Sequence, residues 1–257
     1  GQGQLRVVSS EDGRIEELPL ERTEVEARVS GLIASVTVRQ VFSNEREEPT
    51  EAAYHFPLPV NAAVDAMTIV AGERRIVGRV ERRQEARVIY RRARDAGLFA
   101  ALLEQQRPNL FTQRVANLPP GESVTVELHY VQRLPHDQGT HEFLFPMVAG
   151  ARAQDPTAAG ESEEDELVEQ QVPGTRTGDI DVTVIVDAGV PIENLRSPSH
   201  PINQQREGEA RATVSLRTDA EVANRDFLLR YDVAGDGPRA SVLSSRDDRG
   251  GFFSVLI

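Results

Sequence analysis

The chain has 257 residues, and its formal net charge of −12 at pH 7 disfavours nucleic acid as a partner, because phosphate binding needs a positive field. With 39% hydrophobic and 27% charged residues it is globular in composition, and it has no run near the ~18 apolar residues of a membrane-spanning helix. Cys and Lys are absent, which excludes disulfides, thiolate catalysis, cysteine zinc sites and lysine Schiff bases.

Alternation of apolar and polar residues begins in the first fifty residues. The apolar positions lie on both sides of Gly31: Val25, Ala27 and Val29 before it, and Ala34, Val36, Val38 and Phe42 after it. This period of two predicts two half-buried antiparallel strands joined by a tight turn.

The stretch Tyr-His-Phe-Pro-Leu-Pro at residues 54–59 ends the next predicted strand. Pro57 and Pro59 cannot donate to a sheet ladder, so they stop the pairing while the backbone stays extended. We therefore interpret this stretch as structural, with Tyr54 and Phe56 facing a core and His55 a polar neighbour at the surface.

Residues 81–106 break the β pattern. Ala86, Ile89, Tyr90, Ala93 and Ala96 recur at helical spacing before Gly97, a residue suited to a helix C-cap. A second short helix is predicted over residues 98–106. Further strands are predicted at residues 66–70, 74–80, 122–134 and 141–145, the last returning antiparallel to the one before it.

The acidic segment 151–174 has no periodicity, and a second alternating block follows it. These patterns predict a mainly β protein: an antiparallel β-sandwich domain with one helical insertion at 1–150, a loop or linker at 151–174, and a β-rich segment at 175–257.

Several of these stretches, in register over about residues 24–147, resemble the vault protein inter-alpha-trypsin (VIT) domain. They are Val36-Thr-Val-Arg-Gln-Val-Phe-Ser-Asn44, Ala53-Tyr-His-Phe-Pro-Leu-Pro59, Gly78-Arg-Val80, the series Ala86, Tyr90, Ala93 and Gly97, and Asn117-Leu-Pro-Pro-Gly-Glu122. Residues 224–231 and 251–253 are similar to the segment that precedes a von Willebrand type A domain in inter-alpha-trypsin-inhibitor heavy chains. The resemblance implies that such a domain follows Ile257, and its Asp-x-Ser-x-Ser metal motif does not occur here.

The strongest candidate for a binding surface is a local excess of positive charge. Nine Arg and two Glu lie between residues 74 and 94, and Arg83, Arg87, Arg91 and Arg94 follow helical spacing. This stripe is either a solvated face or a docking surface for an acidic partner, a polyanionic glycan or the acidic run 161–169 of the same chain.

Catalysis has little support in the sequence. His129, His136 and His141 flank one predicted hairpin and could bind a metal, but their spacing matches no known ligand signature. Ser, His and Asp are all present, without the Gly-x-Ser-x-Gly motif that marks a nucleophile.

We therefore expect a non-enzymatic module without cofactors. By resemblance, it would support a type A domain in an exported protein (extracellular, cell-surface or periplasmic) that contacts a protein partner or a matrix component. The alternative is a polyanion-binding module that uses residues 74–94, and a hydrolase or metalloenzyme ranks third. An open edge in the C-terminal sheet would allow a homodimer.

Overall fold

The computed structural model describes residues 3–8, 15–78, 83–107, 110–137, 139–147, 178–217, 225–233, 241–247 and 250–256. The protein is mainly β, with one helix in these ranges, α1 (Arg83–Asp95). No helix in the described ranges is long and apolar enough to cross a membrane. The mainly β class with one helical insertion, predicted from the sequence, is confirmed.

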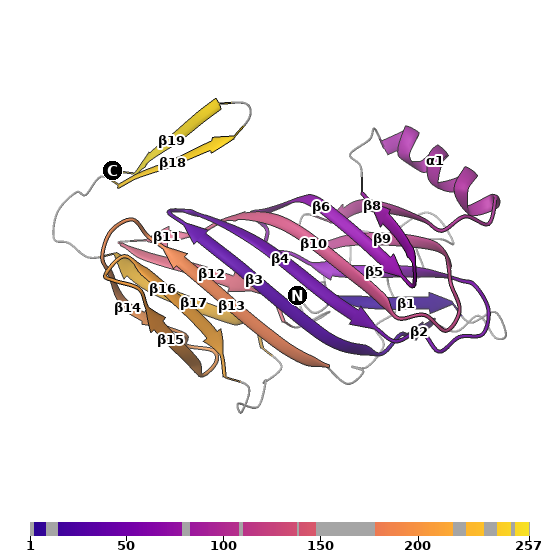
Figure 1. The fold of residues 1–257 in the computed structure, drawn as a ribbon, viewed down its shortest axis with the longest axis horizontal. Coiled ribbons are helices and arrows are strands. Elements are labelled where there is room, and N and C mark those ends of the chain that lie inside the picture. The colour runs from indigo at the N-terminus through magenta and orange to yellow at the C-terminus, as the bar shows by residue number, and fades with distance from the viewer. Residues whose placement is uncertain are drawn as a thin grey trace.

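The largest sheet has eight strands and extends along the whole molecule (Figure 1). Its order is β15 (Ile202–Arg206), β16 (Arg211–Leu216), β13 (Asp179–Asp187), β3 (Leu20–Ser30), β4 (Ile33–Phe42), β10 (Val124–Arg133), β6 (Ala62–Ala71) and β7 (Arg74–Val77). The alternation around Gly31 becomes the hairpin of β3 and β4, in which Gly31 adopts a φ of +56° in the two-residue turn.

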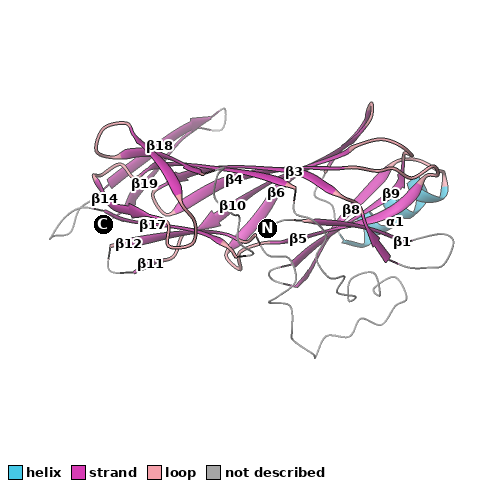
Figure 2. Ribbon diagram, turned by 90° about the horizontal axis from the view of Figure 1, so that it is seen from below, coloured by secondary structure: helices cyan, strands magenta, loops and turns pink. Residues whose placement is uncertain are grey.

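Two smaller sheets lie against one face of the eight-stranded sheet, one toward each end (Figure 2). The five-stranded sheet has the order β2 (Ile15–Glu17), β1 (Gln4–Val8), β5 (Thr50–Pro57), β9 (Leu110–Leu118) and β8 (Ala100–Arg107). The four-stranded sheet has the order β11 (His136–Asp137), β12 (Thr140–Phe145), β17 (Phe227–Val233) and β14 (Ile192–Arg196). A separate hairpin joins β18 (Ser241–Asp247) and β19 (Gly250–Leu256).

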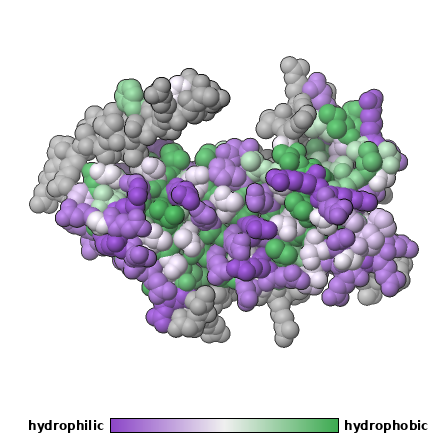
Figure 3. Space-filling model, in the orientation of Figure 1, coloured by the Kyte–Doolittle hydropathy of each residue, from purple (hydrophilic) through white to green (hydrophobic). Residues whose placement is uncertain are grey.

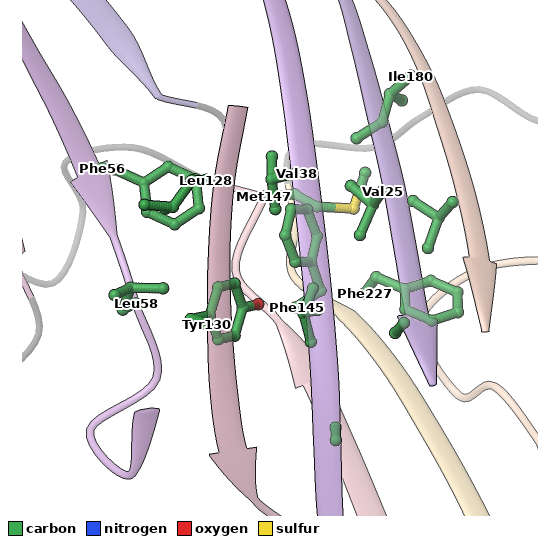
Figure 4. Packing of buried hydrophobic residues seen from close by; sticks show 14 of the residues in the cluster. Val25, Val38, Phe56, Leu58, Leu128, Tyr130, Phe145, Met147, Ile180 and Phe227 are labelled. Atoms are coloured by element: carbon green, nitrogen blue, oxygen red, sulfur yellow. The ribbon is translucent and has the colours of Figure 1, made fainter. Parts of the chain in front are cut away.

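A single hydrophobic core joins the three larger sheets. Figure 4 shows Phe56, Tyr130, Phe145 and Phe227 from four different strands of these sheets among its members. Each of these four side chains is at most 1% exposed. On the opposite face of the eight-stranded sheet, Glu26, Arg28, Arg39 and Glu127 are exposed.

The strands on the two sides of the acidic segment share sheets. β13 pairs with β3 in parallel, and β17 pairs with β12 antiparallel. The acidic segment 151–174 itself lies outside the described residues, so its division of the chain into two domains stays a prediction.

Two predicted elements differ from the observed fold. Most of the segment predicted as a second helix forms β8, because its pairing with β9 outweighs the helical preference of Ala, Leu, Glu and Gln. β12 pairs with β11 and β17 rather than returning beside β10, both of whose edges are taken by β4 and β6.

Candidate interaction surface

The Tyr-His-Phe-Pro-Leu-Pro stretch lies inside the molecule. Tyr54 and Phe56 are 2% and 1% exposed, and their rings stack at a centroid distance of 6.0 Å. β5 ends at Pro57, and Pro59 follows it in a buried position.

Tyr54 belongs to a buried polar network. Its hydroxyl donates to Gln40 Oε1 at 2.5 Å, and the Gly3 N–H donates to the same oxygen at 3.1 Å. Gln40 Nε2 in turn donates to Thr23 Oγ1 at 3.0 Å. The network satisfies every polar group it contains, which points to a structural role for this aromatic residue.

The prediction that His55 faces the surface is wrong. His55 is 7% exposed, because β5 is covered on both faces from Ala52 to Phe56. Burial, together with the positive charges of Arg6 and Arg114, lowers the pKa of His55 to about 3. Its Nδ1 lies 3.1 Å from Thr112 Oγ1.

Helix α1 is fixed at its C-terminal end. Gly97 has a φ of +70°, its N–H donates to the carbonyl of Arg94, and the Leu98 N–H donates to the carbonyl of Ala93. These two bonds form a Schellman cap. Asn117 of β9 adds two more, because its side-chain amide donates to the carbonyls of Arg94 and Leu98 at 3.1 and 2.8 Å.

The contact between α1 and the sheet is narrow. Tyr90 packs with Leu102 and Ala116 in a small cluster of its own, with Ala86 and Ala100 at its margin. Ile89, which shares the helical spacing of Ala86 and Tyr90, is nevertheless 59% exposed. The helix meets only the edge of the five-stranded sheet, so a residue 100° around the helix from Tyr90 reaches solvent.

The predicted arginine stripe divides into two parts. Arg87 and Arg91 are exposed, whereas Arg94 is half-buried and pairs with Glu51 of β5 at 3.7 Å and with Asp95 at 3.2 Å. The hydrogen bond to Asp95 raises the pKa of Arg94 above its ordinary value. The side chain of Arg83, at the first position of α1, lies outside the described residues.

The exposed side of α1 combines apolar and cationic side chains. We use the term α1 surface for this set: Arg87, Val88, Ile89, Arg91, Arg92 and Leu98. Val88, Ile89 and Leu98 are 40%, 59% and 59% exposed. Figure 3 shows hydrophobic and hydrophilic side chains side by side at the end of the molecule where α1 lies. Such a mixture suits a partner that is both acidic and apolar.

The three histidines considered as metal ligands do not converge. His136 and His141 face each other across β11 and β12, with ring centroids 4.8 Å apart, whereas His129 lies in the eight-stranded sheet. Among the described residues, no group of three His, Cys, Asp or Glu could hold a metal ion.

Sequence reasoning missed one polar cluster. On the solvent face of the eight-stranded sheet, His129 is hydrogen-bonded both to Ser35 and to Asp65, which are far from it in the sequence. Only the register of three strands brings them together, and the only local sequence signal is an interrupted alternation in β6.

Comparison with known proteins identifies relatives of this chain. The model of the vault protein inter-alpha-trypsin domain family matches residues 20–130. Protein mono-ADP-ribosyltransferase PARP4 of Mus musculus is 30% identical over 225 residues, covering 87% of this chain and 11% of that protein. The von Willebrand factor A domain-containing protein 5A of Homo sapiens is 29% identical over 225 residues, covering 84% of this chain and 28% of that protein. The chain therefore spans less than a third of each of these relatives.

Solved structures show weaker similarity. A putative nutrient binding protein of Legionella pneumophila has 13% identity and a TM-score of 0.46, covering 90% of this chain and 71% of that one. An M1 zinc metallopeptidase of Deinococcus radiodurans has 13% identity and a TM-score of 0.44, covering 90% and 44%. Similarity at this level assigns no function.

Proposed function

Since this chain contains a vault protein inter-alpha-trypsin (VIT) domain, matched at residues 20–130, we propose that it is a protein-interaction module and that the α1 surface docks a partner segment with acidic and apolar side chains. The observation that carries this proposal is the exposure of Val88, Ile89 and Arg92 on one face of a helix whose end is capped. The docking role requires no catalysis by this chain.

The apolar residues favour a protein over a polyanionic glycan. A sulfated glycan satisfies arginines but gains little from Val88, Ile89 and Leu98, whereas burying one such side chain completely contributes about 1.5–3 kcal/mol. The arginines would steer an acidic segment toward this face of a chain whose net charge is −12.

The relatives suggest a further part of this proposal. One of them is a von Willebrand factor A domain-containing protein that is more than three times longer than the matched region. We propose that this chain supports such a domain in a longer protein, and that this protein is exported or at the cell surface and contacts proteins or matrix components. Fractionation of cells that produce the full-length protein tests the compartment.

A homodimer is a separate proposal. β15 is an edge strand of the eight-stranded sheet, and Asn203, Gln204, Gln205 and Arg206 within it are exposed. Pairing of two copies of β15 would satisfy the open hydrogen-bonding groups of this edge. Light scattering after gel filtration, at several concentrations, tests it.

The α1 surface can be tested with a synthetic probe. We would measure binding of a helical 20-residue peptide with Glu and Leu on one face, beside a scrambled peptide of the same composition and beside heparin. Replacing Ile89 by Ser should weaken binding of the peptide about 5- to 30-fold, corresponding to about 1–2 kcal/mol, and leave heparin retention unchanged.

Charge reversal provides the second arm of this experiment. Arg91→Glu with Arg92→Glu should weaken binding of the peptide about tenfold at low salt and less at high salt, because exposed charges are screened. Arg39, an exposed arginine of β4 and therefore far from α1 in the sequence, provides the matched control, and Arg39→Glu should have little effect on binding. Equal binding of the scrambled peptide, or retention of heparin without binding of either peptide, would favour the polyanion function instead.

A further inference from the structure

Three side chains on neighbouring strands form a hydrogen-bonded chain of Ser, His and Asp. Ser35 Oγ of β4 lies 2.8 Å from His129 Nε2 of β10, and His129 Nδ1 is hydrogen-bonded to Asp65 Oδ1 of β6. Of the two ring nitrogens, one therefore contacts the hydroxyl and the other contacts the carboxylate. This is the arrangement in which a histidine can take a proton from a serine while a carboxylate holds the ring in place.

Strand register explains why the three side chains share one face. Ser35 pairs with Val131, two residues beyond His129, so the serine and the imidazole are diagonal neighbours across β4 and β10. Where β10 pairs with β6, the register shifts between His129 and Tyr130 of β10, which are opposite Ala66 and Val64 of β6. Asp65 and Ala66 are both exposed as a result, although they are consecutive.

The β-bulge is the feature that aims the carboxylate. Without it, regular alternation from Met67, which is buried, would turn Asp65 toward the core. Bulges commonly re-aim a side chain next to a functional site. The irregularity thus places a negative charge beside His129 and keeps it 51% exposed, so that the carboxylate stays hydrated.

The surroundings of Ser35 define the chemical class of a ligand. Val131, opposite Ser35 on β10, and Ile33, two residues away on the same face, are 37% and 49% exposed. Arg28 is opposite Ser35 on β3, and its guanidinium donates to Glu26. The hydroxyl therefore has apolar side chains and a cationic group as its neighbours, which suits an apolar acyl group whose carbonyl oxygen gains negative charge.

We propose that Ser35 is a nucleophile that accepts an acyl group from an activated ester with a short apolar acyl chain. In this step, the bond from Ser35 Oγ to the carbonyl carbon forms while the Oγ proton moves to His129 Nε2. The bond from that carbon to the leaving oxygen then breaks, and the leaving group departs with its electron pair and takes the proton from His129. The products are an acyl ester on Ser35 and a free alcohol or phenol.

His129 is the general base of this step, and Asp65 is a positioning residue that acts through His129. General base catalysis by a positioned side chain contributes about 10²- to 10⁴-fold to a rate. A serine without such a partner should react more slowly by this factor. Ser215 offers the comparison, because it is also half-buried and lies on β16 of the same eight-stranded sheet.

The probe for this proposal is p-nitrophenyl butyrate. We would treat the protein at neutral pH, follow p-nitrophenol release, and locate the butyryl group by peptide mass spectrometry. We expect one adduct per chain, on Ser35. Ser35→Ala should abolish it, His129→Gln should slow its formation at least about 100-fold, and Ser215→Ala should leave it unchanged.

Substitutions of Asp65 separate positioning from a general structural effect. Asp65→Asn should slow acylation of Ser35, and Asp65→Glu should restore part of the rate, since it returns the carboxylate. All of these positions face solvent, and the thermal midpoint of each variant checks that it folds. The proposal is overturned if the wild-type protein gives no adduct on Ser35, or if the adduct forms equally fast in His129→Gln.

Discussion

The buried network around Gln40 gives the sharpest stability prediction. In the variant Gln40→Leu, the side chain keeps its approximate volume but loses both polar atoms. The Tyr54 hydroxyl, the Thr23 hydroxyl and the Gly3 N–H then lose the partner they have in the structure. Gln40 and Thr23 are both 0% exposed, so water cannot replace the amide without rearrangement.

The expected cost follows from this count. Each unsatisfied buried group costs about 1–3 kcal/mol, so three of them should lower the free energy of unfolding by about 3–9 kcal/mol. Tyr54→Phe is the matched comparison, because it removes one donor and leaves Gln40 Oε1 with the Gly3 N–H. Its cost should be about 1 kcal/mol.

Urea unfolding at pH 7, followed by circular dichroism, measures both variants. We expect the midpoint of Gln40→Leu to fall several times further than that of Tyr54→Phe, with the slope unchanged. If the two variants lose the same stability, or if Gln40→Leu is as stable as the wild type, then the hydrogen bonds of Gln40 do not stabilise the fold as argued above.

Three further predictions concern stability and the α1 surface. Burial lowers the pKa of His55 to about 3 and that of His141 to about 4, from an ordinary value of 6.5, so both side chains stay neutral in the folded protein. The stability that is present above pH 6.5 should therefore fall on acidification, by about 2 kcal/mol per histidine at pH 5. Urea unfolding at the two pH values should show a smaller loss for a variant with both histidines replaced by Gln than for the wild type. Asn117→Gly keeps the positive φ of +54° but removes the two side-chain hydrogen bonds to the C-terminal end of α1. Relative to the wild type, hydrogen exchange should become faster in residues 83–98 and change little in the rest of the chain. Exchange that changes equally along the chain would contradict the capping role. A β-carbon at Gly178 would lie 2.3 Å from the backbone oxygen of Glu21, so Gly178→Ala should lower the thermal midpoint by displacing the start of β13 from β3, and an unchanged midpoint would count against this packing.

Local alternation was sufficient to predict the hairpin of β3 and β4. Both strands bury one face only, so the pattern of Val25, Ala27 and Val29 reports directly which side meets the core. The same rule failed at His55, because β5 is buried on both faces and a period of two carries no information there.

Long-range pairing explains the other errors. Residues 100–107 include good helix formers, and their strand conformation depends on pairing with β9, which comes later in the chain. The parallel pairing of β13 with β3 joins segments more than 150 residues apart and has no local signal. For these elements, tertiary contacts rather than local propensity determine the secondary structure and the strand pairing.

The candidate sites likewise combine features that local sequence patterns predict with features that depend on long-range contacts. The spacing of the arginines and Gly97 allowed α1 and its cationic side to be predicted, whereas the exposure of Ile89 depends on how little of the helix the sheet covers. The cluster of Ser35, His129 and Asp65 requires a bulge and two registers, so no sequence spacing could reveal it.

The central claim is that the α1 surface is the interaction face of this protein. Hydrogen exchange of the whole chain, with and without saturating acidic amphipathic peptide, tests this claim most directly. We expect slower exchange on binding in residues 83–98 and no change in β3 and β4. Protection that maps to another part of the chain, or equal protection of the wild type and the Ile89→Ser variant at a peptide concentration near the wild-type dissociation constant, would contradict it.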